Sequence, residues 1–496
     1  MSAIQELREH FEEIMRLHYI QALLSWDQEV NMMEYKDLGG RSKQVSLIEK
    51  LMHKRVTDEK VGRLIKEAEK LELDEVESAM LREMTREYNL ATKLPEKLVT
   101  EIAETSILAA KEWRQARTKS DFSIFQELLE KTVELQREKA EKLGTHADLY
   151  STLIDLYEPG ATYDWIANIF NPLRPKLIEF VRKLNSSPNQ PDDSVFKKHF
   201  DESKQFELSR EVIKKLDFDF GYGRQDKVTH PFTTSLASLD VRITTRTSEP
   251  FPDCITSTIH EYGHAMYEMG IRKELHDTIL CTGASMGIHE SQSRMWENIV
   301  GRSKEFWIYW YPTFKKYFPK NLKKFPLEEF HRAINKVQPS FIRVNADEVT
   351  YGLHIILRFE IEKDLIEGKI QVSELPEIWN SKFEELLGIV PPDDAKGVLQ
   401  DVHWSMGSIG YFPSYFLGNL YAAQIYNKAL EKLPSLPEDY KKGVFSNLLS
   451  YLKENIHQHG SIYLADDLIK RVTGEELNSD YFVEYIENKY TPIYRL

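Results

Sequence analysis

Two histidines four residues apart, with a glutamate directly after the first, are the strongest chemical signal in this sequence. His260, Glu261 and His264 form the pattern H-E-x-x-H within TSTIHEYGHAMYEMG, residues 256–270. Because an α-helix turns once in about 3.6 residues, both imidazoles would lie on one face, each with a nitrogen about 2 Å from a shared metal ion. Glu261 then lies at the edge of that face and can accept a proton from metal-activated water. The pattern therefore predicts a zinc-type hydrolytic centre.

A third protein ligand is needed to complete such a centre. The variant of the motif that uses a third histidine requires Gly at position 267 and His at position 270, and it is excluded because this chain has Tyr267 and Gly270. We predict that the third ligand is Glu290, in GASMGIHESQSRMWENIVGRS. Glu297 lies seven residues later on the same helical face and is the competitor. We expect it instead to orient one of the two histidines or to form a surface ion pair.

Other polar residues near these ligands can support them. Glu268 follows His264 by four residues, and it is either a hydrogen-bond partner near the metal or an ordinary helical glutamate. His289, Ser291 and Gln292 surround the predicted third ligand and are expected to act as hydrogen-bond donors around it.

The H-E-x-x-H segment must be helical for this geometry. Thr256, Ser257 and Thr258 are candidates for the N-cap of that helix, and Gly270 is typical of a helix end. The preceding stretch, HPFTTSLASLDVRITTRT (residues 230–247), is rich in β-branched residues and alternates in part, which predicts strand structure.

Most of the remaining chain has apolar residues three and four positions apart, which predicts helices. Clusters of Pro, Ser, Asn and Asp predict breaks at residues 185–195 and 390–392. The predicted fold class is mainly α: one large helical fold with one small β-sheet next to the metal helix. We expect a single domain over residues 1–496, in which 1–200 are mostly helical and 230–415 carry the active site.

Charge and composition exclude several classes of partner. The chain has 496 residues and a net charge of -14, and it contains no long lysine or arginine block. Nucleic acids and acidic membrane surfaces are therefore poor partners, because both require a basic surface. We expect no transmembrane helix, because no run of about 18 apolar residues occurs.

Two cysteines, Cys254 and Cys281, are too few for a disulfide framework. Both flank the histidine motif, yet zinc-binding cysteines usually occur as close pairs, so we predict free buried thiols. The first residues, MSAIQELREHFEEIMRLH, mix both signs of charge and lack the pattern of a secretory signal. We expect the protein to be cytoplasmic.

Five segments in the second half of the chain form a more specific pattern than the histidine motif alone. They are DVRIT (240–244), HEYGH (260–264), HESQ (289–292), IRVNADEVTY (342–351) and GVLQDVHW (397–404). Together, and in this order, they resemble the carboxypeptidase Taq family of metallocarboxypeptidases.

This resemblance implies a largely helical fold with a deep groove, a homodimer, and removal of single C-terminal residues from peptides that have a free C-terminus. It also assigns the metal to His260, His264 and Glu290, in agreement with the spacing argument. One divalent ion per chain is expected. Zinc is the first candidate, and cobalt or manganese can replace it in a site of two nitrogens and one oxygen.

A carboxypeptidase must bind the terminal carboxylate of its substrate, and arginine is the natural residue for that role. The matching segments contain two arginines. We favour Arg343 for the carboxylate, and we expect Arg242 to line the groove or to pair with a nearby acid. Gln400 and Tyr415 are further candidates for substrate binding.

A peptide hydrolase also needs a hydrogen-bond donor at the developing oxyanion. His403 is our candidate for that donor or for a contact with the substrate backbone. A tyrosine hydroxyl is expected beside it, and Tyr411 is favoured over Tyr415. Asp401 is predicted to orient a neighbouring residue.

The acidic pair Asp347 and Glu348 can be read as a catalytic acid and base. Because the metal already supplies activated water, we predict that both are structural or support the site from outside it. Trp404 is predicted to be a packing residue.

Two alternatives remain open. A helical oligopeptidase that cuts internal bonds would use the same zinc chemistry. A non-catalytic helical scaffold would be expected to have a broken ligand set, whereas His260, Glu261, His264 and Glu290 are all present.

Overall fold

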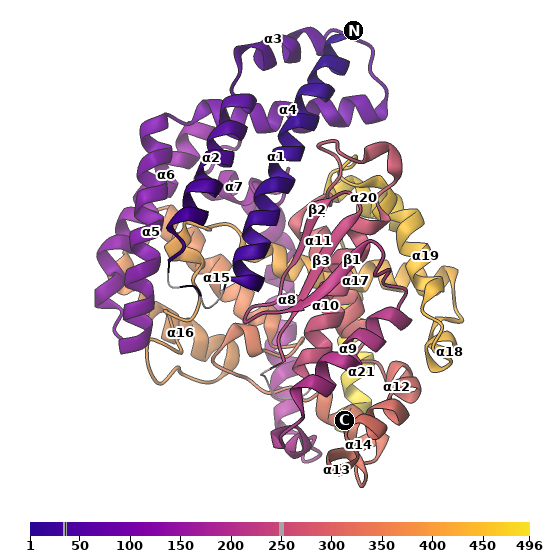
Figure 1. Cartoon of the computed structure of the whole chain (residues 1–496). Helices are drawn as coiled ribbons and strands as arrows, with labels where there is room; N and C mark the ends of the chain where they lie inside the picture. The colour runs from indigo at the N-terminus through magenta and orange to yellow at the C-terminus, as the bar shows by residue number, and fades with distance from the viewer. Residues whose placement is uncertain (33–34, 36, 248–251) are drawn as a thin grey trace. The chain divides into compact units, whose positions relative to one another are not determined.

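A computed structural model of the chain describes residues 1–32, 35, 37–247 and 252–496. These residues are mainly helical and include one small sheet, as the sequence predicts (Figure 1). They divide into two compact units. Unit 1 comprises Met1–Thr92, Asp192–Ile334 and Tyr421–Leu477, and unit 2 comprises Lys93–Pro191, Asn335–Leu420 and Asn478–Leu496. Each unit is thus assembled from three separate stretches of chain, and the single domain stays a prediction. Among the described residues, no helix is both long and apolar enough to cross a membrane.

Unit 1 contains the sheet and the helices that pack around it. Its helices are α1 (Ala3–Asn31), α2 (Gly39–Val56), α3 (Glu59–Ala68), α4 (Glu75–Lys93), α9 (Glu202–Lys215), α10 (Asp253–Gly270), α11 (Met286–Arg294), α12 (Lys304–Tyr317), α13 (Pro319–Leu322), α14 (Leu327–Ile334), α18 (Leu436–Lys441), α19 (Ser446–Asn455) and α20 (Ala465–Thr473). Shorter turns are η1 (Ser194–Lys197), η2 (Lys273–Leu275), the π-helical η3 (Met295–Val300) and η7 (His457–His459). Helix α17 (Phe412–Lys432) begins in unit 2 and continues into unit 1.

The sheet lies between α1 and α10. Strands β1 (Gly223–Lys227), β3 (Asp240–Thr245) and β2 (Thr233–Ala237) lie side by side in that order, with β3 parallel to β1 and antiparallel to β2. Side chains alternate between the two faces of a strand. Thr245 accordingly donates a hydrogen bond to the carbonyl of Cys254 in α10, while Arg242 packs on Trp26 of α1. The strand prediction for residues 230–247 is confirmed, and β1 is an addition to it.

Helix α10 begins earlier than the sequence predicts. It starts at Asp253, so Thr256, Ser257 and Thr258 lie inside its first two turns, and the N-cap prediction for these three residues was wrong. Their hydroxyls instead donate to backbone carbonyls three or four residues earlier, which is the usual alternative for hydroxyl side chains within a helix. The predicted helix end at Gly270 is confirmed.

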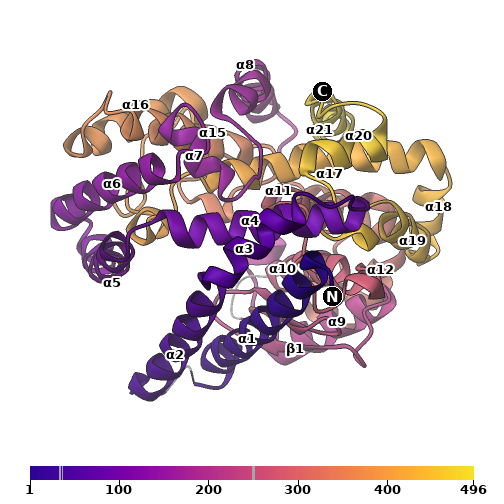
Figure 2. The same ribbon diagram turned by 90° about the horizontal axis from the view of Figure 1, so that it is seen from above.

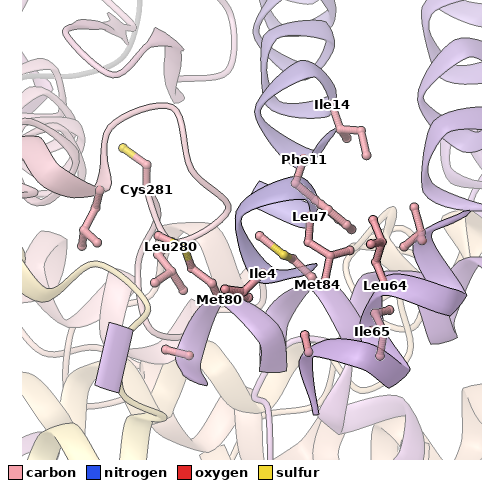
Figure 3. Packing of buried hydrophobic residues seen from close by; sticks show 14 of the residues in the cluster. Ile4, Leu7, Phe11, Ile14, Leu64, Ile65, Met80, Met84, Leu280 and Cys281 are labelled. Carbon is pink, nitrogen blue, oxygen red and sulfur yellow. The ribbon is translucent and has the colours of Figure 1, made fainter. Parts of the chain in front are cut away.

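The N-terminal helices are anchored by an apolar cluster in unit 1. Helices α1 and α2 run side by side (Figure 2). On α1, Leu7 and Phe11 point toward Met84 of α4 and Leu64 of α3 (Figure 3). The cluster residues of α1 recur at intervals of three and four, as expected for a helix that buries one face. Burial of each such side chain contributes about 1.5–3 kcal/mol, so this cluster fixes α1 against α3 and α4.

The regular elements described in unit 2 are all helices or helical turns. It contains α5 (Glu96–Lys119), α6 (Ser123–Leu143), α7 (Leu149–Asp155), α8 (Tyr163–Ser186), α15 (Tyr351–Ile366), α16 (Leu375–Leu387), α21 (Asp480–Tyr494) and the start of α17, with the short turns η4 (Arg343–Asn345), η5 (Val372–Glu374) and η6 (His403–Met406). Helix α15 is buried on nearly every side, which is typical of the central helix of a core. The break predicted at residues 390–392 falls between helices, and the one predicted at 185–195 covers the end of α8, the loop after it and the start of η1.

Candidate functional site

Three side chains in unit 1 converge as a metal site requires. His260 and His264 lie one turn apart on α10, and Glu290 lies on α11. The Nε2 atom of His260 is 3.5 Å from Oε2 of Glu290, and Nε2 of His264 is 3.3 Å from the same oxygen. The three ligand atoms all lie within 4.8 Å of one another. Two imidazole nitrogens and one carboxylate oxygen form a donor set that fits a divalent metal such as zinc.

The outward-facing nitrogen of each ligand histidine has its own partner. Nδ1 of His260 is 2.9 Å from Oε2 of Glu297. Nδ1 of His264 is 2.6 Å from Nδ1 of His289, whose Nε2 is 2.8 Å from Oε1 of Glu268. An ionised carboxylate only accepts hydrogen bonds, so a neutral His289 donates from Nε2 and accepts at Nδ1. Both ligand histidines therefore carry their proton on Nδ1, which leaves each Nε2 lone pair directed at the metal position.

Glu297 contacts a ligand histidine, His260, and thereby takes the first of its two predicted roles, which was to orient a histidine. It lies in the π-helical turn η3, which continues α11, and Arg294 and Arg302 lie beside its carboxylate. Burial opposes its ionisation, but the hydrogen bond to His260 and the nearby arginines outweigh that cost and lower the pKa of Glu297 to about 2. Glu297 is therefore a charged acceptor for the proton on His260 at neutral pH.

Replacing Glu297 by glutamine should weaken metal binding about 10- to 100-fold, because the charged acceptor that fixes the ring of His260 is lost. Competition against a fluorescent zinc chelator would measure the dissociation constant. Glu328→Gln is a matched control, because the carboxylate of Glu328 pairs with Lys304 on the surface. The zinc affinity of this variant should equal that of the parent. Equal affinities in both variants would show that Glu297 does not support the metal site.

The predicted general base is fixed by the sheet. Glu261 is buried, and its Oε2 accepts a hydrogen bond of 2.7 Å from the hydroxyl of Thr233 on β2. The same hydroxyl lies 3.0 Å from the backbone carbonyl of Glu261. Burial raises the pKa of Glu261 above its ordinary value, which makes its carboxylate a better proton acceptor. Strand β2 thus holds this carboxylate in one orientation.

Arg242 forms an ion pair with a nearby acid, which is one of the two roles that the sequence predicted for it. Its Nε and Nη2 donate to the two carboxylate oxygens of Asp240, at 3.0 and 2.9 Å. The guanidinium also lies 4.2 Å from the ring centroid of Trp26 on α1, a distance at which a cation and an aromatic face attract. Contact of Arg242 with substrate stays a prediction.

A second polar cluster lies in unit 2, around the other predicted arginine. Nε and Nη2 of Arg343 donate to Oδ1 of Asp401 at 3.0 and 2.9 Å, and Nε of Arg358 donates to Oδ2 at 2.7 Å. Nη1 of Arg343 also donates to the hydroxyl of Tyr351. The prediction that Asp401 orients a neighbour is confirmed. Two guanidinium groups share its one carboxylate, so these three side chains carry an excess positive charge. Burial opposes ionisation of Asp401, but the arginines hold its pKa well below the usual range.

Gln400 forms hydrogen bonds with the backbone around Arg343. Its Oε1 accepts a hydrogen bond of 2.8 Å from the backbone N–H of Arg343, and its Nε2 donates to the carbonyl of Phe341 at 2.9 Å. These contacts fix the turn η4 from which the arginine projects. A direct contact between Gln400 and substrate stays a prediction.

The predicted oxyanion residues are neighbours in unit 2. The ring of His403 stacks on that of Tyr411, with centroids 5.6 Å apart, and its Nε2 lies 3.4 Å from the hydroxyl of Tyr415. Burial lowers the pKa of His403 to about 4, so its ring is neutral at pH 7 and retains one N–H donor. The structure thus brings together a histidine and both candidate tyrosines.

The remaining polar residues singled out in the sequence have structural roles. Asp347 accepts hydrogen bonds from the backbone of Val349 and Thr350 where α15 begins. Glu348 accepts from side chains of α21, at Tyr485, Lys489 and Tyr490. The structural interpretation of both acids is confirmed. Cys254 and Cys281 are free and buried, as predicted.

The predicted residues are divided between the two units. The metal ligands, Glu261 and Arg242 belong to unit 1, whereas Arg343, Gln400, His403, Tyr411 and Tyr415 belong to unit 2.

The carboxylate of Glu290 accepts from Ser293 and Arg294, neither of which was predicted. The predicted donors, His289, Ser291 and Gln292, bond other groups, so that prediction was wrong. Thr233 and Arg358 were also missed. The signal for Arg358 was a charged residue directly after a run of apolar residues, whereas Thr233 resembles any other β-branched residue of its strand.

The chain is similar to known metallocarboxypeptidases in sequence and in fold. The family model of the carboxypeptidase Taq (M32) metallopeptidases matches residues 6–490. The chain is 45% identical over 415 residues to carboxypeptidase 1 of Bacillus subtilis, covering 83% of this chain and 82% of that protein. It is 38% identical to thermostable carboxypeptidase 1 of Pyrococcus furiosus, covering 98% of each. Its fold is similar to the crystal structure of an M32 carboxypeptidase from Deinococcus radiodurans, with a TM-score of 0.96, 36% identity and full coverage of both chains.

Proposed function

This chain belongs to the carboxypeptidase Taq (M32) family of metallopeptidases, and from that premise we propose how its own residues remove the last residue of a peptide. It is a metallocarboxypeptidase, which is a peptide hydrolase. The observation that carries the proposal is the convergence of His260, His264 and Glu290, with the buried carboxylate of Glu261 on the same helix.

We place one divalent ion on the three converging ligands, with zinc as the first candidate and cobalt or manganese as alternatives. When bound, this ion would act as a Lewis acid that polarises the scissile carbonyl and lowers the pKa of water. Glu261 accepts the proton of the attacking water and then delivers it to the leaving amine. Its burial supports this role because it favours proton uptake, and its hydrogen bond to Thr233 does so because it restricts the carboxylate to one orientation.

Arg343 is the proposed receptor for the terminal carboxylate of the substrate. The excess positive charge that it forms with Arg358 around Asp401 supports this role, because a buried cationic group favours an anionic partner. Gln400 and Tyr415 would complete the substrate-binding residues in this unit. Arg242, in unit 1, is the remaining candidate for a contact with substrate.

His403 and Tyr411 are the proposed donors to the oxyanion that develops as water adds to the carbonyl. The neutral state of His403 supports its role, because a neutral ring donates a hydrogen bond without repelling the arginines beside it. A homodimer in the cytoplasm completes the proposal. The homodimer rests on the resemblance of the five sequence segments to the family, and the location rests on the two cysteines, which are too few for a disulfide framework.

The free C-terminus is the feature of the substrate that this proposal makes essential. Amidation of the C-terminus should lower kcat/KM about 100-fold or more, because it removes two charge-assisted hydrogen bonds to an arginine, worth about 1.5–3 kcal/mol each. Two peptides of one sequence, free and amidated, would be incubated with the metal-loaded protein and the products identified by mass spectrometry. Single-residue losses from the free peptide alone are expected.

The other results of this experiment separate the alternatives. Internal cuts in both peptides would identify an oligopeptidase and would remove the role of Arg343 in binding a carboxylate. No cleavage of either peptide, with metal bound, would instead favour a non-catalytic scaffold.

A further inference from the structure

Helix α15 carries a stripe of polar side chains that the proposed mechanism leaves mostly unused. The helix is buried on most sides, yet Tyr351, His354, Arg358 and Glu362 recur at intervals of three or four residues and therefore lie on one side of it. Tyr351 and Arg358 contact the Arg343–Asp401 pair, as described above. Glu362, at the other end of the stripe, contacts a different part of unit 2.

The carboxylate of Glu362 is fully buried and receives three hydrogen bonds. Its Oε1 accepts from Nε1 of Trp404 at 2.8 Å. Its Oε2 accepts from the hydroxyl of Tyr150 and from the backbone N–H of Gly410, each at 2.9 Å. An indole N–H and a backbone N–H can only donate, so the surroundings of Glu362 are built for an acceptor. The packing prediction for Trp404 therefore omitted its polar contact.

These bonds hold both ends of one short segment. Trp404 directly follows His403, and Gly410 directly precedes Tyr411. The turn at Gly410 is tight: its φ is +89°, and a Cβ there would lie 2.7 Å from the carbonyl carbon of Leu153 in α7. The segment 403–411 is thus held against the same helix that supplies Tyr150, the third donor to Glu362.

We propose that Glu362 is a positioning residue for peptide hydrolysis: it fixes segment 403–411 and thereby sets where His403 and Tyr411 present their donors to the oxyanion. This inference rests on the roles proposed above for those two side chains. A buried carboxyl group costs stability, and burial raises the pKa of Glu362 to about 7. An apolar side chain would avoid that cost, so the carboxylate needs a reason other than stability. The reason we infer is that Glu362 alone holds both Trp404 and Gly410, and so positions His403 and Tyr411 next to them.

Glu362→Gln tests the proposal in the metal-loaded full-length protein. Glutamine keeps the volume, but its NH2 group faces donors, so at least one of the three hydrogen bonds is lost. We expect kcat to fall about 10- to 100-fold with KM within about twofold, because a small displacement of catalytic groups has an effect of that size. Metal affinity should be unchanged. Glu362→Asp keeps an acceptor and should recover part of kcat, which a merely structural role does not require.

The indole of Trp404 provides an independent signal. The difference in tryptophan fluorescence between the parent and Trp404→Phe gives the emission of Trp404. The same difference, measured with Glu362→Gln present in both proteins, should be altered, because the indole loses its acceptor. Glu348→Gln is a matched control, because this other buried carboxylate of unit 2 binds α21, outside segment 403–411. It should lower thermal stability and leave kcat unchanged.

The outcomes separate this inference from the mechanism on which it rests. Parent-like kcat in Glu362→Gln, beside a large loss in His403→Ala, would overturn the positioning role alone. Parent-like kcat in both His403→Ala and Tyr411→Phe would overturn the proposed oxyanion donors. If Glu362→Gln does not fold, Trp404→Phe removes one of the same contacts, and an unchanged kcat there would count against the proposal.

Discussion

Replacing Glu261 by glutamine is expected to leave the metal bound and to lower kcat about a thousandfold, the middle of the range for loss of a general base. Glutamine has nearly the same volume, and its amide oxygen can still accept the hydrogen bond from Thr233. It cannot take a proton from water at neutral pH. The measurements are kcat at saturating peptide and the metal content of the purified variant by elemental mass spectrometry.

A second glutamate of the same helix provides the contrast. Glu268 contacts His289 and through it His264, so Glu268→Gln should weaken metal binding instead. At saturating metal, its kcat should exceed that of Glu261→Gln by far. If Glu261→Gln hydrolysed peptides at the parent rate with metal bound, another group would have to accept the proton. Loss of the metal from that variant would show that Glu261 belongs to the metal site itself.

The parts of the fold that were predicted are those specified by local sequence pattern. The periodicity of apolar residues predicted the helices, and β-branched residues predicted β2 and β3. Strand β1 was missed because its sequence, GRQDK, has no β-branched or aromatic residue. It is a strand because β3 offers it a parallel partner, which is a tertiary effect that outweighs local propensity.

The site follows the same division between local and distant determinants. Glu297 was singled out because it lies seven residues after Glu290 on one helical face, and it was predicted either to orient a histidine or to form a surface ion pair. The sequence left Glu268 undecided, because its partner His289 lies on another helix. The composition of the two units from interleaved segments was not predicted either, because only one of their boundaries, at residues 191–192, falls within a predicted break.

Asp401→Asn is expected to lower the free energy of unfolding by about 3–5 kcal/mol at neutral pH, because it leaves Arg343 and Arg358 without the carboxylate that both of them bind. The pKa of Asp401 is lower in the folded chain than in the unfolded one, so the folded state binds fewer protons at this group. Its contribution is complete above the unfolded pKa of about 3.9 and is lost as the pH falls below it toward the folded pKa. The gap between parent and variant in urea unfolding should therefore be largest near pH 7 and should shrink below about pH 4.

Two further variants decide whether uncompensated charge is the cause. Asp480→Asn removes the partner of Lys176 from an exposed ion pair of the same unit, and it should cost less than about 1 kcal/mol. The double variant Asp401→Asn, Arg358→Met removes one of the two positive charges together with the carboxylate. If the loss in Asp401→Asn comes from two arginines buried without a counter-charge, the double variant should be more stable than the single one. If it is no more stable, the loss comes from the hydrogen bonds of Asp401, and the excess positive charge that supports binding of a terminal carboxylate by Arg343 would lose its energetic basis.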